Sequence, residues 1–190
     1  DDQVALDLEE ALRNVSGVNL VAGGEGVTIF SRGVSTSTLE DGFSISEFSN
    51  GDIRRSALDT YNLEQVEVFK GPASVLYGRG NAGGTINLVT KQPVAERLFG
   101  ATFTTDTNGT LRGTVDAGGS VSEDGRVRFR LPVLYEQTES FRDVIESETT
   151  ALSPSLAIDL SERTTLLLEG EAYQSDGIPD SGLPRDAEGD

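Results

Sequence analysis

The glycines of the stretch GRGNAGG raise the first question about chemistry. Gly78, Gly80 and Gly83 spell G-x-G-x-x-G, the spacing of dinucleotide-binding loops. Such a loop needs a strand before the glycines and a helix after them, because the helix N-terminus holds the pyrophosphate. Here the pattern predicts a short helix over 71–78, then the glycines, then a strand over 85–90. We therefore expect the glycines to permit positive φ angles and close backbone packing, not to bind a nucleotide.

Side chains that commonly carry enzyme chemistry are scarce. The 190 residues include no histidine and no cysteine, which removes the commonest general base, the thiolate nucleophile and the usual transition-metal ligands. Carboxylates are abundant, but the D-x-D-x-D-G spacing of calcium loops does not occur. The net charge of −17 disfavours a nucleic-acid partner, because phosphate contacts require a basic face. We expect no enzyme activity, no metal centre and no covalently bound cofactor.

The sequence of the first half of the chain predicts a short helix and several short strands, which could position the glycine-rich loop at 78–84. A helix is expected from Asp7, its N-cap, to Gly17, which suits the left-handed position past the last turn. Its apolar face consists of Leu8, Ala11, Leu12 and Val15. Strands are expected over 27–30, near Leu39, over 43–45, over 65–69 and over 85–90, with long loops within 34–60.

After Pro93 the pattern changes to long alternating strands, which begin near Leu98. Asn108-Gly109 and Asp124-Gly125 are hairpin signals, and 161–163 is a third tight turn. Apolar residues at every second position oppose polar ones in the four expected runs, over 110–117, 126–135, 152–160 and 166–172. This pattern is typical of a membrane β-barrel wall with a wet interior, and equally of a soluble antiparallel sheet with one buried face. The row Arg126, Arg128 and Arg130 faces a pore in the first case and bulk water in the second.

Four or five strands cannot close a barrel, which requires about eight or more. Because open edges are not tolerated in lipid, a barrel wall here is expected to be a processed or trimmed piece of a larger protein. The alternative is a self-associating β-rich fragment that forms multimers or fibres through unpaired strand edges. A third hypothesis is a soluble ligand- or carbohydrate-binding β module. Pro132 argues against an ordinary wall, since it removes a ladder hydrogen bond in mid-strand.

Two blocks of sequence resemble the plug domain of TonB-dependent outer-membrane receptors, in the ferric-siderophore branch. The longer block reads NLEQVEVFKGPASVLYGRG over 62–80 and GGTINLVTK over 83–91. The segment 8–18 is similar to the family's ALRNVPGV helix, with Ser16 where proline is usual. Shorter matches lie at 31–33, 41–42, 141–143, 153–156 and 164–166.

The resemblance implies an α+β plug, a small mixed sheet with short helices, over 1–95. It implies that 96–190 form the first antiparallel β-strands of an incomplete transmembrane β-barrel. In this family a barrel of about 22 strands encloses the plug. The plug gates uptake of a ferric siderophore, the transported ligand, with force from TonB of the inner-membrane complex. The implied location is the bacterial outer membrane, and the implied partners are TonB, the remaining barrel strands and outer-membrane lipid. A segment gripped by TonB through strand addition is expected ahead of Asp1.

The resemblance also assigns candidate site residues. The apical loops that bind the ferric chelate contain Gly24, Glu25, Arg54, Arg55, Arg79 and Asn81. The arginines among them could attract an anionic chelate. Arg32 and Lys70 match two plug cations that pair with barrel glutamates in this family. Those glutamates would lie on later strands, beyond this sequence.

Overall fold

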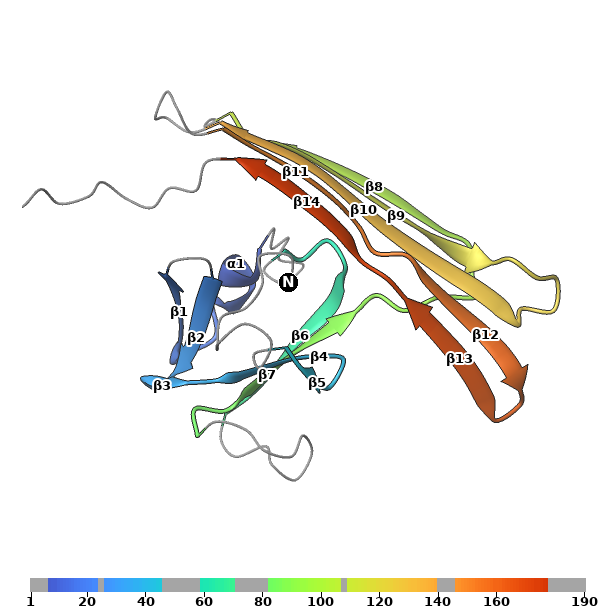
Figure 1. Ribbon diagram of the computed structural model, residues 1–190, viewed down its shortest axis with the longest axis horizontal. Helices are drawn as coiled ribbons and strands as arrows, with labels where there is room; N and C mark the ends of the chain where they lie inside the picture. The colour runs from blue at the N-terminus through green and yellow to red at the C-terminus, as the bar shows by residue number, and fades with distance from the viewer. Residues whose placement is uncertain are drawn as a thin grey trace, which may run out of the picture.

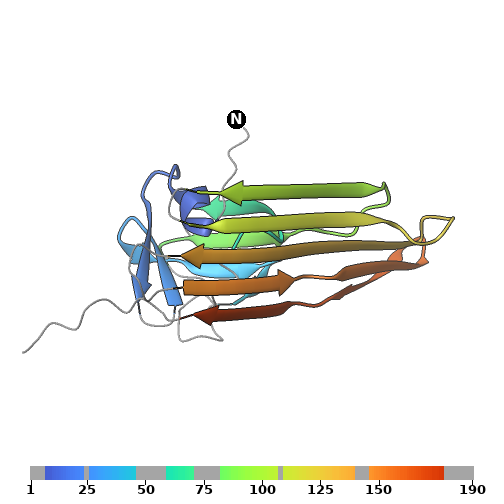
Figure 2. The ribbon, with the colours of Figure 1, turned by 90° about the horizontal axis from the view of Figure 1, so that it is seen from above.

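The structure, a computed structural model, describes residues 7–23, 26–45, 59–70, 82–106, 109–139 and 146–177. These residues form one helix and three β-sheets. The helix and the two smaller sheets make up the N-terminal half, and the third sheet, which we call the wall, is built by strands β8 to β14 (Figure 1). The N-terminal half lies along one face of the wall in both views (Figures 1 and 2). No helix within the described ranges is long and apolar enough to cross a membrane.

Helix α1 spans Leu8–Leu12 and is shorter than the predicted helix. The predicted cap is confirmed, because the Glu10 amide donates to Asp7 Oδ1 at 2.7 Å. Beyond Leu12 the chain tightens into turns, with the Val15 amide donating to the Leu12 carbonyl at 2.9 Å. Residues 13–17 include Asn, Val, Ser and Gly, which are weaker helix formers than the residues of α1. Gly17 has the predicted positive φ, at 76°.

Two small sheets form the rest of the N-terminal half. One is antiparallel, in the order β1-β2-β3, and the other has the order β5-β4-β7-β6 with β4 parallel to β7. The strands are β1 (Val18–Gly23), β2 (Gly26–Ser31), β3 (Val34–Ser35), β4 (Ser37–Glu40), β5 (Phe43–Ser44), β6 (Leu63–Phe69) and β7 (Thr85–Thr90). All five predicted strands are confirmed. The sequence pattern does not predict β1, which pairs with β2 across the expected glycine loop.

The helix and both small sheets share one apolar core. Its buried members are Leu8, Leu12, Val18, Ile29, Ile45, Ile86 and Leu88. Gly83 permits the close packing expected of the glycine motif, since a Cβ there would lie 2.4 Å from the Val34 carbonyl oxygen of β3. Gly84 takes a φ of 115°. The predicted helix over 71–78, with Gly78 and Gly80, lies outside the described residues.

The wall is antiparallel throughout. Its strands are β8 (Leu98–Thr105), β9 (Leu111–Ser120), β10 (Val127–Glu139), β11 (Glu146–Leu152), β12 (Ser155–Ser161), β13 (Thr164–Glu169) and β14 (Ala172–Gly177). Strands β11 and β12 follow one another along the same side of β10, and β14 and β13 pair with them in turn. The prediction of single strands over 152–160 and 166–172 is therefore wrong in detail. The first run is interrupted at 153–154 and the second at 170–171.

Pro132 fits the wall because of these interruptions. The Pro132 carbonyl accepts the Ser153 amide at 3.0 Å, and in a strand the nitrogen of a residue faces the same side as its carbonyl. The missing N–H therefore faces the interruption between β11 and β12, and the side of β10 that pairs with β9 is not affected. On its other side β10 remains paired with β9 through this position.

The two faces of the wall differ in chemistry. The register puts exposed apolar side chains on the face away from the N-terminal half, among them Phe99, Phe103, Val115, Leu166 and Leu168. The opposite face carries the charged side chains Arg112, Asp116, Arg128, Arg130 and Glu136. Two of the three arginines in the predicted row thus face the side that the N-terminal half occupies.

Candidate functional site

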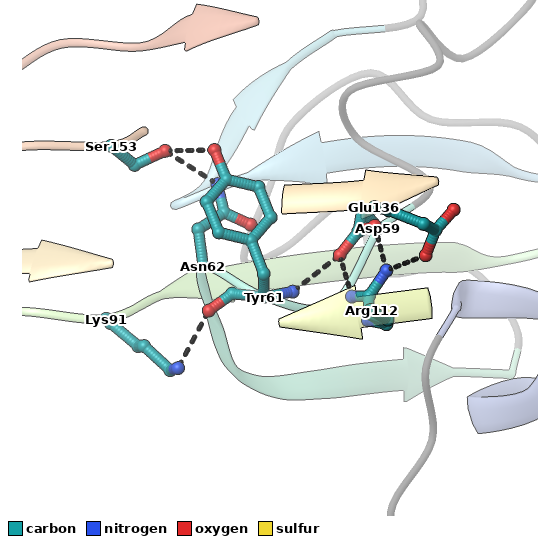
Figure 3. Close-up of polar contacts among 7 residues, drawn as sticks. All are labelled: Asp59, Tyr61, Asn62, Lys91, Arg112, Glu136 and Ser153. Atoms are coloured by element: carbon teal, nitrogen blue, oxygen red, sulfur yellow. Dashed lines mark hydrogen bonds and ion pairs between the residues drawn. The ribbon is translucent and has the colours of Figure 1, made fainter. Parts of the chain in front are cut away.

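A line of polar contacts, which we call the seam, joins the N-terminal half to the charged face of the wall. On one side it uses residues 59–64, which include the first two residues of β6, and residues 91–92, which follow β7. On the other side it uses side chains of β9 and β10 together with Ser153, at the interruption between β11 and β12. Figure 3 shows seven of its residues.

Arg112 of β9 is the least exposed of the three cations that form the ion pairs of the seam (Figure 3). Its side chain is only 5% exposed. Its two terminal nitrogens donate to the two carboxylate oxygens of Asp59, at 2.9 and 2.7 Å, and one of them also donates to Glu136 Oε2 at 2.5 Å. This two-pronged geometry is the strongest that an arginine offers to a carboxylate. It compensates the charge of a side chain that has left water.

Tyr61 anchors the seam through both polar and apolar contacts. Its hydroxyl lies 2.6 Å from Ser153 Oγ, and its amide donates to Asp59 Oδ1 at 2.8 Å. Its ring packs in a small core with Leu134 and Ala151 of the wall. Burial raises the pKa of Tyr61 to about 12, so the phenol is neutral at physiological pH.

A second group of charges lies further along the seam. Lys91 donates to the Tyr61 carbonyl at 2.7 Å and forms an ion pair with Asp116 at 3.1 Å. Arg130 also binds Asp116, through two hydrogen bonds of 2.9 and 2.8 Å, and lies 3.5 Å from Glu64 of β6. Cations and carboxylates therefore alternate across the boundary, which fixes the position of β6 and β7 on the wall.

A polar cleft of about 340 Å³ opens beside these contacts. Its lining includes Glu40, Asp41, Lys91, Ser153, Glu169 and Glu171. Asp41 is engaged within the N-terminal half, where it accepts hydrogen bonds from the amide and hydroxyl of Thr90 at 3.0 and 2.6 Å. In the described part of the chain, no group of three or more Asp or Glu side chains could hold a metal ion.

The structure brings the two predicted latch cations to one corner of the N-terminal half. Arg32 is exposed with a φ of 52°, and its side chain packs beside Gly17. Lys70 is exposed, and its Nζ donates to Ser16 Oγ at 3.2 Å. Their predicted pairing with later glutamates stays a prediction. The six predicted ligand-binding residues, Gly24, Glu25, Arg54, Arg55, Arg79 and Asn81, lie outside the described residues.

The sequence pattern does not identify the seam. Asp59 and Arg112 are 53 positions apart, and Tyr61 and Ser153 are 92 apart. The available signal was Arg112 itself, a large cation among small residues on the polar face of an alternating strand. Asp59 and Tyr61 stand just ahead of the predicted strand over 65–69, in a stretch that reads as a loop.

These observations define a class of protein: a small domain joined by buried polar contacts to one face of a β-wall whose other face is apolar.

The family model "TonB-dependent Receptor Plug Domain" matches residues 1–85. The probable TonB-dependent receptor BfrD of Bordetella pertussis is 36% identical over 191 residues, covering 97% of this chain and 25% of BfrD. The catecholate siderophore receptor Fiu of Escherichia coli is 35% identical over 192 residues, covering 96% of this chain and 24% of Fiu.

Solved structures agree with the sequence relatives. The siderophore receptor PiuA from Acinetobacter baumannii has a TM-score of 0.80 at 30% identity, over 95% of this chain and 26% of PiuA. The pyoverdine outer membrane receptor FpvA of Pseudomonas aeruginosa has a TM-score of 0.79 at 26% identity, over 90% of this chain and 26% of FpvA. The chain belongs to the TonB-dependent receptor family, and it spans about a quarter of the length of these curated relatives.

Proposed function

We propose that this chain is the plug and first barrel strands of an outer-membrane transporter, whose plug gates TonB-energised uptake of a ferric siderophore. The observation that carries the proposal is the position of the plug, which lies against the charged face of a wall with an apolar outer face. A strand with one apolar and one polar face suits a barrel in lipid with a hydrated interior. A plug fixed inside such a barrel blocks the passage until force displaces it.

The division into two domains is part of the proposal. We assign residues 1–95 to the plug and 96–190 to the barrel wall. The family match over 1–85 and the start of β8 at Leu98 support a boundary in this region. The next strand of the barrel would pair with the free edge of β13 and β14, and the outer face would contact outer-membrane lipid.

The ligand is proposed by analogy with the relatives. Fiu is named as a catecholate siderophore receptor, and FpvA was solved bound to pyoverdine. We propose that the apical residues Arg54, Arg55, Arg79, Gly24, Glu25 and Asn81 contact a ferric chelate, and that Arg32 and Lys70 pair with glutamates of later strands. The gate performs no covalent chemistry, and TonB supplies the force. The comparisons give no support to the self-associating alternative.

The test is uptake of radioactive iron by iron-starved cells that express the full-length protein. We expect uptake of a ferric catecholate that stops when the proton-motive force is dissipated, because TonB depends on that force. Deletion of residues 7–91 should abolish the energised uptake. If cells with this deletion take up iron at the undiminished, energy-dependent rate, the plug is not the gate.

A further inference from the structure

We propose that Arg112 is the wall residue that holds the N-terminal end of the plug in its closed position. It does so by binding Asp59, whose backbone pairs with that of Asp7, and we call this contact between Arg112 and Asp59 the clamp. The inference rests on the proposed gating function and names a residue that controls the gate. Arg112 acts through Asp59, so it is a positioning residue and is not proposed to contact the ligand.

Asp59 is the point where the start of the plug and the wall meet. Its backbone forms an isolated antiparallel bridge with Asp7. Its carboxylate is held by both terminal nitrogens of Arg112. Asp7 in turn caps α1 through its bond with the Glu10 amide. A direct chain of contacts therefore runs from the first turn of α1, through one backbone bridge, to a buried cation of the wall.

Burial makes this clamp sensitive to the loss of either partner. Arg112 is 5% exposed and Asp59 15% exposed, so water screens the pair weakly. Without the guanidinium, the carboxylates of Asp59 and Glu136 would face each other with no cation between them. Their repulsion would displace Asp59 from the wall and weaken the bridge to Asp7.

The clamp lies at the N-terminal end of the plug, and this position links it to the proposed gating. Relatives in this family are named as TonB-dependent. If TonB pulls on a segment ahead of Asp1, as the family resemblance implies, the pull reaches Asp7 and its bridge to Asp59 before the sheets of the plug. The other end of the seam, at Lys91 and Arg130, fixes β6 and β7, and β7 leads through residues 91–97 into β8. The contact between Arg112 and Asp59 is thus the part of the seam that is linked directly to Asp7, at the N-terminal end of the plug.

The wall also offers a matched control. Arg128 lies on the same face and pairs with Asp159 at 2.8 Å, within the wall. Its side chain is 26% exposed. The change Arg128→Gln removes an arginine–carboxylate pair of the wall without touching Asp59, so it separates the general effect of losing an ion pair from the effect of losing the clamp.

The experiment is hydrogen–deuterium exchange on the full-length protein, followed in the peptide that contains residues 7–12. We expect Arg112→Gln and Asp59→Asn each to raise the exchange rate there by roughly tenfold, because both release the bridge. The double variant should give no more than either single variant, since both act through one contact. Arg128→Gln should leave the rate unchanged. Arg112→Lys keeps the charge but loses the two-pronged geometry, and an intermediate rate is expected.

Several outcomes would overturn the clamp. These are an unchanged rate at 7–12 in Arg112→Gln, additive effects in the double variant, or an equal rise in Arg128→Gln. Exchange could also rise across β8 to β10 in Arg112→Gln, which would indicate a general loosening of the wall. In that case a faster exchange rate at 7–12 in Arg112→Lys than in Arg128→Gln supports the clamp, and equal rates overturn it. Iron uptake is measured in parallel. If Arg112→Gln leaves both iron uptake and the exchange rate at 7–12 unchanged, the clamp is rejected and the proposed function stands. If Arg112→Gln accelerates exchange at 7–12 but the unaltered protein takes up no ferric chelate, the proposed function is rejected and the clamp stands.

Discussion

At the residue scale, Tyr61 shows how the seam combines burial with hydrogen bonding. It is 4% exposed, its hydroxyl contacts Ser153 of the wall, and its ring packs on Leu134. The neutral phenol suits this site, because an ionised one would be desolvated and would lie near the carboxylates of Asp59 and Glu171. The seam should therefore weaken in alkali.

The pH dependence follows from the raised pKa of Tyr61, about 12 against an ordinary value of 10.0. A raised folded-state pKa contributes stability that is complete below about pH 10 and is lost as pH rises towards 12. Two pKa units correspond to about 3 kcal/mol. We expect the absorbance titrations of the full-length protein and of Tyr61→Phe to differ by one tyrosine that ionises near pH 12. The change Tyr135→Phe, on the outer face, serves as control. A difference curve with its midpoint near pH 10 would contradict the account.

At the element scale, the two small sheets meet where the loop before β7 crosses β3. Gly83 has no room for a side chain, since a Cβ would lie 2.4 Å and 2.6 Å from the carbonyl oxygens of Val34 and Ser35. Both obstacles are backbone atoms, so no side-chain rotation can relieve the clash. The contact holds the antiparallel sheet and the mixed sheet around their common core.

We therefore expect Gly83→Ala to destabilise the plug by about 1–3 kcal/mol, the usual cost of overpacking. The measurement is protease cleavage of the plug in the full-length protein, followed through a urea titration. Gly100→Ala in β8 is the matched control, because nothing lies within 4 Å of its added Cβ. Equal urea midpoints for the two variants would show that β3 does not constrain Gly83 in solution.

Several elements are predictable from local sequence because local chemistry determines them. Asp7 caps α1, Gly17 takes the left-handed conformation, and Gly125 has a φ of 74° at a predicted hairpin turn. The length of α1 is less predictable, since apolar spacing continues to Val15 although the helix ends at Leu12. The sequence pattern also does not predict the interruptions of the wall at 153–154 and 170–171. The alternation of apolar and polar residues continues across them, with the apolar residues on the same face before and after.

At the scale of the whole molecule, the family resemblance predicts a plug that faces a barrel wall, and the structure and comparisons agree with it. The contacts between the two halves are not predictable in the same way. Arg112, Asp59 and Glu136 become neighbours only when the wall and the plug are assembled, and nothing in their local sequence indicates this. The apical residues proposed to contact the ligand rest on the resemblance alone.

The gating proposal is tested most directly by the electrical conductance of the full-length protein in a planar bilayer, with and without residues 7–91. If the plug, fixed on the charged face of the wall, fills the barrel that the wall begins to form, the intact protein is a closed channel. The deletion variant should then show large, stable conductance steps. A deletion variant that inserts into the bilayer and remains as closed as the intact protein would contradict the gating proposal.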